Sequence, residues 1–86
     1  MAKYSIEIKG SAAKEIENLP KRELQTVLHK IHSLTENPRP HGYEKLSGQD
    51  KYRVRCGDYR VLYTIEDIVL IVCVVKVGHR KDVYRG

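Results

Sequence analysis

Three arginines on neighbouring segments are the residues best suited to chemistry. Arg53 and Arg55 alternate with apolar side chains, so they would share one face of a strand. Arg60 follows the pair Gly57-Asp58, a dipeptide of the kind that closes a tight hairpin, and such a hairpin would bring it to the same place. A guanidinium matches phosphate oxygens in pairs through its planar fork. The spacing therefore predicts a cationic surface that holds a phosphodiester, with a merely solvated basic face as the alternative.

A polar segment near the end of the sequence supplies groups that could move protons: His79, Arg80, Lys81, Tyr84 and Arg85. Cleaving RNA without a metal needs a group that takes or orients the 2′-hydroxyl proton, donors that stabilise the charged phosphate, and an acid for the leaving 5′-oxygen. Arginine stays protonated, whereas histidine titrates at about 6.5 and tyrosine at about 10, and nearby arginines would lower the tyrosine pKa. Tyr84 is the tyrosine that points most to function, because no apolar stripe explains its position.

The elements that must position these residues begin with a strand and two helices. Tyr4, Ile6 and Ile8 alternate with polar residues and predict a strand. A short helix is expected from Ala12 to Asn18, with Ser11 as its N-cap. A second helix is expected to begin at Pro20 and to end before the prolines that follow Asn37. Its apolar residues at helical spacing are Leu24, Val27, Leu28, Ile31 and Leu34.

The remaining half of the chain predicts strands. A loop is expected over His41–Asp50, followed by strands over Lys51–Cys56, Tyr59–Ile65 and Ile68–Val77. The last of these is almost continuously apolar, which is typical of a central strand. The expected order is β-α-α-β-β-β: one α+β domain over residues 1–86, in which two helices pack on a small, mostly antiparallel sheet.

Charge and composition favour a soluble protein with an anionic partner. The formal charge is +5, and residues 45–86 carry nine Lys/Arg against five Asp/Glu, a net of +4. No apolar run approaches the roughly 20 residues that cross a bilayer, and the first residues lack a signal-peptide pattern. We expect a cytoplasmic protein with no membrane partner.

Cysteines and histidines do not predict a cofactor or a metal site. Cys56 and Cys73 lack the spacing of a metal or redox motif and are expected to be reduced, partly buried thiols. His29 and His32 lie three apart on the second helix, but two ligands without a third are more typical of a helix surface.

Three runs, in this order, resemble motifs of the RelE/ParE toxin superfamily, and the resemblance covers essentially the whole chain. They are Glu44-Lys45-Leu46-Ser47-Gly48, then Lys51-Tyr52-Arg53-Val54-Arg55 with Asp58-Tyr59-Arg60-Val61-Leu62-Tyr63, and finally Val77-Gly78-His79-Arg80-Lys81-Asp82-Val83-Tyr84. The last run is similar to the RelE branch. The resemblance implies a toxin of a type II toxin–antitoxin system that cleaves messenger RNA in the ribosomal A site by 2′-hydroxyl attack, without a metal. It also implies a RelB-like antitoxin as partner, and operator DNA reached indirectly through that antitoxin.

Carried over by position, the resemblance implies roles for individual residues. Arg53, Arg55 and Arg60 would stabilise the scissile phosphate, Arg80 would stabilise or protonate the leaving group, and Tyr84 would orient the nucleophile or act as base. Contacts to RNA or the ribosome would come from Lys45, Lys51, His79, Lys81 and Arg85.

One departure from the family shifts the proton chemistry. RelE members often have lysine where this chain has Arg53 and Arg55, and arginine, unlike lysine, effectively cannot lose its proton. A base would then be Tyr84 or His79. Two other readings remain: a ParE-like toxin that inhibits DNA gyrase by binding, and a catalytically silent protein that binds its antitoxin.

Overall fold

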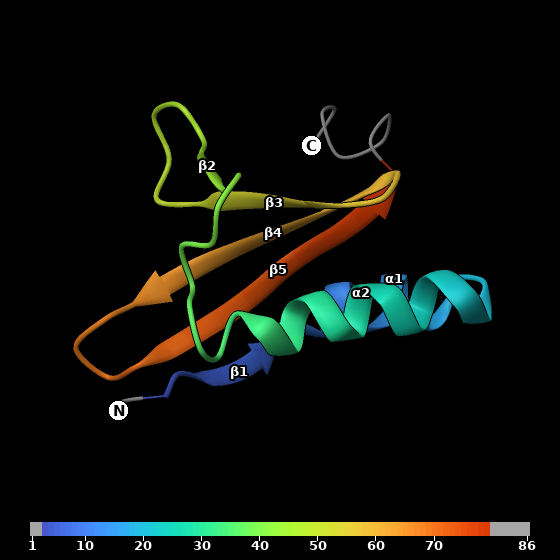
Figure 1. Ribbon diagram of the computed structural model, residues 1–86, viewed down its shortest axis with the longest axis horizontal. Helices are drawn as coiled ribbons and strands as arrows, with labels where there is room; N and C mark the ends of the chain where they lie inside the picture. The colour runs from blue at the N-terminus through green and yellow to red at the C-terminus, as the bar shows by residue number, and fades with distance from the viewer. Residues whose placement is uncertain (1–2, 80–86) are drawn as a thin grey trace.

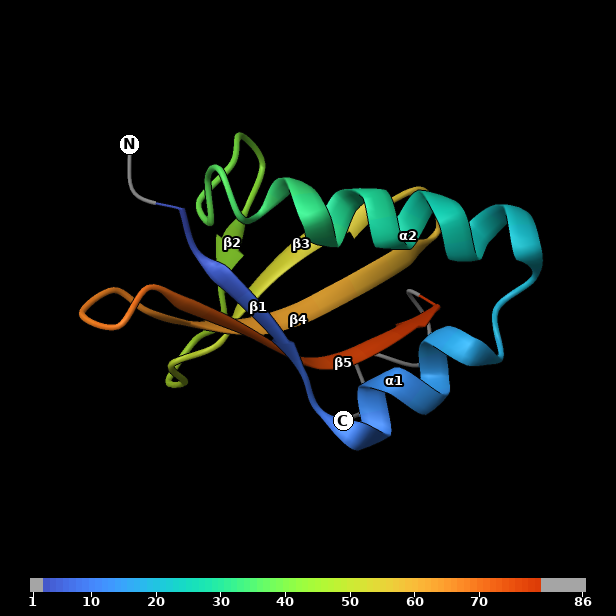
Figure 2. The same ribbon diagram turned by 90° about the horizontal axis from the view of Figure 1, so that it is seen from below.

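Two helices cover one face of a five-stranded mixed sheet (Figures 1 and 2). The computed structural model describes residues 3–79. The order of elements is β-α-α-β-β-β-β, which is the predicted α+β order with one short strand added. Within the described residues, the second face of the sheet carries no helix (Figure 2).

The first strand leads directly into the first helix. Strand β1 (Ser5–Ile8) pairs in parallel with β5 (Ile71–His79), and the Lys9 N–H donates to the Val74 carbonyl at 2.9 Å. The Ala13 N–H then donates to the Lys9 carbonyl at 2.9 Å, which starts helix α1 (Gly10–Glu17). The predicted N-cap at Ser11 is therefore wrong: Lys9 holds that position, because the chain enters the helix as soon as the strand pairing ends.

Helix α2 (Lys21–Ser33) begins one residue later than predicted, because Pro20 is its N-cap rather than its first helical residue. Its apolar stripe packs on the sheet through Val27 and Ile31, and Leu34 just beyond the helix is fully buried. Leu28 departs from the predicted stripe, since 41% of it is exposed. The core-facing stripe is narrower than the sequence pattern predicted.

The sheet has the strand order β1-β5-β4-β3-β2. Apart from the parallel pair of β1 and β5, all its neighbours are antiparallel, in agreement with the predicted mostly antiparallel sheet. Strand β3 (Tyr52–Cys56) and β4 (Tyr59–Glu66) form a hairpin through Gly57-Asp58, where Gly57 has a φ of +62°. Glycine adopts that conformation without the strain that a Cβ would add.

The largest differences from the predicted strands concern β2 and the start of β5. The expected loop over residues 41–50 contains a two-residue edge strand, β2 (Glu44–Lys45), which pairs with the start of β3. The last strand begins at Ile71, three residues later than expected, because Ile68 and Val69 lie in the turn from β4 to β5 and are 98% and 57% exposed. Leu70 completes that turn with a φ of +57°.

The core lies between the helices and the facing side of the sheet. Ala12 and Ile16 of α1 and the buried residues of α2 meet the inward-facing residues of three central strands, which are Val54, Val61, Tyr63, Val72, Val74 and Val77. Val74 and Val77 are three residues apart because the β4–β5 register shifts between Leu62 and Tyr63. The fully buried Tyr63 donates its hydroxyl to the Pro38 carbonyl at 2.7 Å, and burial raises the pKa of its phenol to about 12. No helix in residues 3–79 is long and apolar enough to cross a membrane.

Candidate phosphate-binding face

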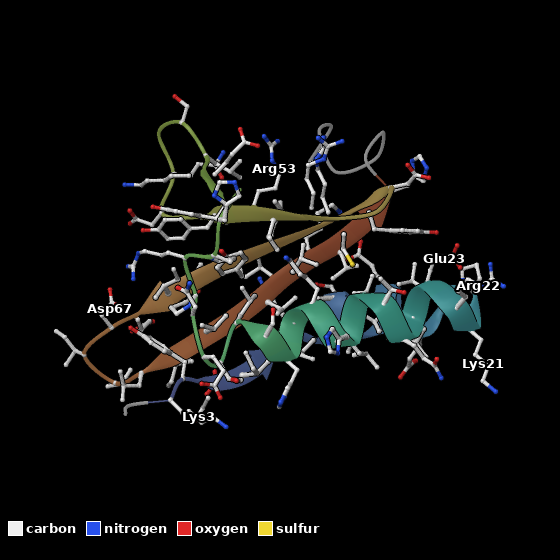
Figure 3. The ribbon with its side chains drawn as sticks, viewed as in Figure 1. Lys3, Lys21, Arg22, Glu23, Arg53 and Asp67 are labelled. Carbon is white, nitrogen blue, oxygen red and sulfur yellow. The ribbon has the colours of Figure 1, made fainter. Side chains whose placement is uncertain are left out.

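Arg53, Arg55 and Arg60 come together on the face of the sheet opposite the helices. In the β3–β4 hairpin, Arg55 pairs directly with Arg60, and Arg53 pairs with Leu62. Their strand neighbours Val54 and Val61 are buried in the core, so alternation directs the arginines the other way. Figure 3 shows Arg53 on the side of β3 that faces away from α2. We call these three residues the arginine cluster.

The three guanidinium groups differ in how freely they can move. Arg60 is buried, with 6% of the residue exposed, and the Arg53 side chain is 13% exposed, whereas Arg55 is exposed. A buried charge is costly unless neighbouring groups stabilise it, so Arg53 and Arg60 are held in place by their surroundings. Two fixed cations beside a third, exposed one form a preorganised site for an anion.

Glu44 is a member of this face that the sequence reasoning missed. It pairs with Arg53 in the β2–β3 register, and its Oε1 accepts a hydrogen bond from Arg53 Nη2 at 2.9 Å. The bond to Arg53 and its charge, with smaller contributions from Arg60 and Arg55, lower the pKa of the Glu44 carboxyl. The only signal in the sequence was its place in a family-like run, because a two-residue strand has no periodicity from which a register could be predicted.

The predicted RNA contacts lie in different places. Lys51 is exposed and precedes Arg53 by two residues, the spacing that shares its face. Lys45 is exposed on β2 opposite Tyr52, on the other side of the sheet from Glu44. Arg80, Lys81, Tyr84 and Arg85 lie outside the described residues.

His79 ends β5 beside the core rather than beside the arginines. It pairs with Tyr59, and the two rings meet edge to face with centroids 5.7 Å apart. Tyr59 packs against the core, whereas its neighbour Arg60 faces the other way. The register therefore places His79 on the helix side of the sheet, while Gly78 lies next to Arg60.

Comparison with known proteins identifies the family of the chain. The sequence model of the ParE toxin of type II toxin–antitoxin system, parDE, matches residues 6–84. The chain is a member of the RelE/ParE toxin family. It is 31% identical over 86 residues to toxin RelG of Mycobacterium tuberculosis, which covers 95% of this chain and 97% of that protein.

Two solved structures share the fold of this RelE/ParE toxin. A chain of the toxin–antitoxin complex RelBE2 from Mycobacterium tuberculosis superposes with a TM-score of 0.84 at 28% identity, covering 95% of this chain and 97% of that one. A chain of the archaeal RelE–RelB complex from Pyrococcus horikoshii superposes with a TM-score of 0.82 at 29% identity, covering 93% and 98%. These likenesses confirm the predicted family and fold class.

Cys56, His29 and His32 of this RelE/ParE toxin lie on the helix side of the sheet, away from the arginine cluster. Cys56 is buried on the core side, its Sγ donates to the Thr26 carbonyl at 3.4 Å, and burial raises the pKa of its thiol. His29 and His32 are exposed on α2, and residues 3–79 contain no group of three His, Cys, Asp or Glu side chains that could hold a metal ion. Cys56 has the surroundings of a packing residue rather than of a nucleophile.

Proposed function

We propose that this type II toxin is a ribosome-dependent endoribonuclease that cleaves messenger RNA in the A site, through attack of a 2′-hydroxyl on the adjacent phosphodiester and without a metal. The observation that carries the proposal is the arginine cluster, in which Arg53, Arg55 and Arg60 meet on a sheet face that no described helix covers. Donors already in place before substrate arrives stabilise the extra negative charge of a pentavalent phosphate without reorganising.

The arginine cluster would supply the electrostatic part of the reaction. Arg53 and Arg60, which are nearly buried, would hold the phosphate oxygens, and the exposed Arg55 would close on the phosphate from solvent. None of the three can act as base, because guanidinium keeps its proton. The family resemblance assigns the proton transfers to Arg80 and Tyr84, which would lie beside the leaving oxygen and the nucleophile.

Partners follow from the same proposal. The two similar structures are the toxin–antitoxin complex RelBE2 and the archaeal RelE–RelB complex. We propose a RelB-like antitoxin for this toxin, operator DNA bound indirectly through that antitoxin, and translating ribosomes in the cytoplasm as the site of action. A basic toxin surface that binds ribosomal RNA would make the association sensitive to salt.

Translation in a purified bacterial extract tests the nuclease directly. The toxin is added to extract that is translating a defined message, and the 5′ ends of the message are mapped by primer extension. New ends at A-site codons, which disappear when initiation is blocked, are the expected result. Intact message with normal protein synthesis would contradict the proposal.

A second candidate function is inhibition of DNA gyrase by binding, because the family description that matches residues 6–84 is that of ParE. In that case purified gyrase would lose supercoiling activity in the presence of the toxin, while the message in the extract stays intact. Inactivity in both assays would favour a catalytically silent protein that binds its antitoxin.

A further inference from the structure

The Glu44 carboxylate is paired with Arg53 of the arginine cluster. Its Oε1 lies 2.9 Å from Arg53 Nη2, in a pair whose arginine side chain is 13% exposed and whose glutamate side chain is 57% exposed. The β2–β3 and β3–β4 registers place Arg55 and Arg60 one pair further along the same face. The negative charge of Glu44 therefore lies among the three cations that would hold a phosphate.

A carboxylate and a phosphodiester are alternative partners for the same donors. Both present oxygens that a guanidinium fork binds through charge-assisted hydrogen bonds. If a phosphate enters the cluster, Arg53 has to exchange one anion for the other, or both anions have to share it at a distance where like charges repel. In either case Glu44 reduces the affinity for the incoming phosphate.

Glu44 lies on an edge strand, from which its side chain can be displaced, whereas Arg53 lies on a strand that is paired on both sides. Strand β2 has two residues and lies at the edge of the sheet, paired on one side only, with β3. Arg53 is in the interior hairpin strand, paired with Glu44 on one side and Leu62 on the other. An exchange of anions would therefore displace the Glu44 side chain and leave the arginine cluster in place.

We propose that Glu44 competes with the RNA phosphate for Arg53: its carboxylate is an alternative partner of the Arg53 guanidinium and lowers the affinity of the arginine cluster for phosphodiesters. This inference rests on the proposed function, because it takes RNA as the ligand of that face. It assigns Glu44 no role in the proton transfers, and it predicts that removal of the Glu44 charge strengthens RNA binding.

The test uses RNA that cannot be cleaved, so that binding is measured apart from chemistry. A short single-stranded 2′-O-methyl oligonucleotide, which lacks the nucleophile, is titrated with the wild type, Glu44→Gln and Glu36→Gln over a range of salt concentrations. Glu36 is the matched control, because it pairs with Lys3 at 3.0 Å on the surface, and its substitution also removes one carboxylate from one ion pair.

Glu44→Gln is expected to lower Kd about three- to tenfold at low salt, since the negative charge that competes with the phosphates for Arg53 is removed. The salt dependence should also steepen by about 0.7 in log Kd per log salt, the value for one additional phosphate contact on a single strand. Glu36→Gln should change Kd less than about twofold, as expected for a charge outside the binding face. Glu44→Asp, which keeps the charge, should bind close to the wild type.

The inference is wrong if Glu44→Gln binds the oligonucleotide no more tightly than Glu36→Gln does. It is also wrong if Glu44→Gln melts at the wild-type temperature but binds more weakly than the wild type, or if none of the proteins binds the oligonucleotide. The cleavage assay in extract is read separately. If the wild type cleaves the message and Glu44→Gln binds RNA as the wild type does, the role of Glu44 as a competitor is rejected and the proposed nuclease function stands. If Glu44→Gln binds RNA more tightly but the wild type does not cleave the message, the proposed nuclease function is rejected and the role of Glu44 as a competitor is supported.

Discussion

At the scale of single residues, the same pair of side chains, arginine and carboxylate, serves two purposes in this toxin. Arg53 of the arginine cluster pairs with Glu44, where the arginine is nearly buried. Under the proposal above, an incoming phosphate competes for this arginine. Arg39 and Asp67 meet at the β4–β5 turn, where Figure 3 labels Asp67, and the pair ties three segments together. Chemical identity alone did not distinguish the two pairs; the register and the partners of each pair did.

The Asp67 carboxylate is the centre of the structural tie. It accepts hydrogen bonds from Arg39 Nη2 at 2.8 Å, from Arg39 Nη1 at 3.2 Å and from the Tyr4 hydroxyl at 2.6 Å. These bonds join the start of β1, the loop after α2 and the β4–β5 turn. The hydrogen bonds from Arg39 and then from Tyr4 lower the pKa of Asp67 to about 2.

We therefore predict that the contribution of Asp67 to stability depends on pH. A carboxyl whose pKa is lowered by folding stabilises the native state above its unfolded pKa of about 3.9, and loses that effect as the pH falls toward the folded value. Asp67→Asn should unfold at lower urea than the wild type at pH 7, and the difference should shrink between about pH 4 and pH 2. Glu66→Gln, an exposed carboxylate one residue away, is the control. An Asp67→Asn deficit of the same size at both ends of this range would contradict the prediction.

At the scale of elements, the hydrophobic pattern of the sequence predicted the strands and helices that bury one face. It was wrong where an apolar residue is exposed. Alternation around Val54 and Val61 located the central hairpin and placed its arginines on the outer face. The two-residue β2 was missed because it is too short to alternate, and with it the partner of Arg53. The start of β5 was wrong because Ile68 is apolar but lies in a turn.

The turn between β4 and β5 supports a direct test of this distinction. Ile68 is 98% exposed and Ile31 of α2 is 3% exposed, although both lie in apolar patterns of the sequence. Ile68→Ala should change the free energy of unfolding by less than about 0.5 kcal/mol, as is usual for a surface position. Ile31→Ala should cost about 2–4 kcal/mol, because it removes buried methyl groups and leaves a cavity. Urea unfolding of the two variants gives both values, and a comparable loss in both would mean that Ile68 is buried in solution.

At the scale of the whole molecule, the sheet divides a packing side from a side that carries the arginine cluster. The helices and the core occupy one face, so a substitution there acts mainly through stability. The arginine cluster occupies the other, and its exposed member can be changed without disturbing the core. The family-derived residues Arg80 and Tyr84 belong to the proposed chemistry but lie outside the described residues, so the sequence resemblance supports their roles while the geometry supports those of the arginine cluster.

This division predicts that the same substitution, arginine to alanine, slows message cleavage on one side of the sheet and not on the other. Arg55 is exposed on β3 among the arginine cluster, and Arg22 is exposed at the start of α2, across the sheet from it (Figure 3). Arg55→Ala and Arg22→Ala remove the same charge, and neither residue is buried, so both variants should melt within a few degrees of the wild type. Under the proposed function, Arg55→Ala should slow message cleavage in the extract by about tenfold or more, the effect of losing one donor to the transition state.

Arg22→Ala should cleave within about twofold of the wild type, because Arg22 lies at the start of α2 on the helix side of the sheet and is not a member of the arginine cluster. Equal losses in the two variants would mean that the toxin is attracted to RNA by its overall charge and not through the arginine cluster. Normal cleavage by Arg55→Ala with loss in Arg22→Ala would place the substrate on the helix side of the sheet. We would measure the rate at which the A-site ends appear, at one toxin concentration and in two salt concentrations. A general charge effect weakens with salt in both variants, whereas the loss of a positioned donor persists.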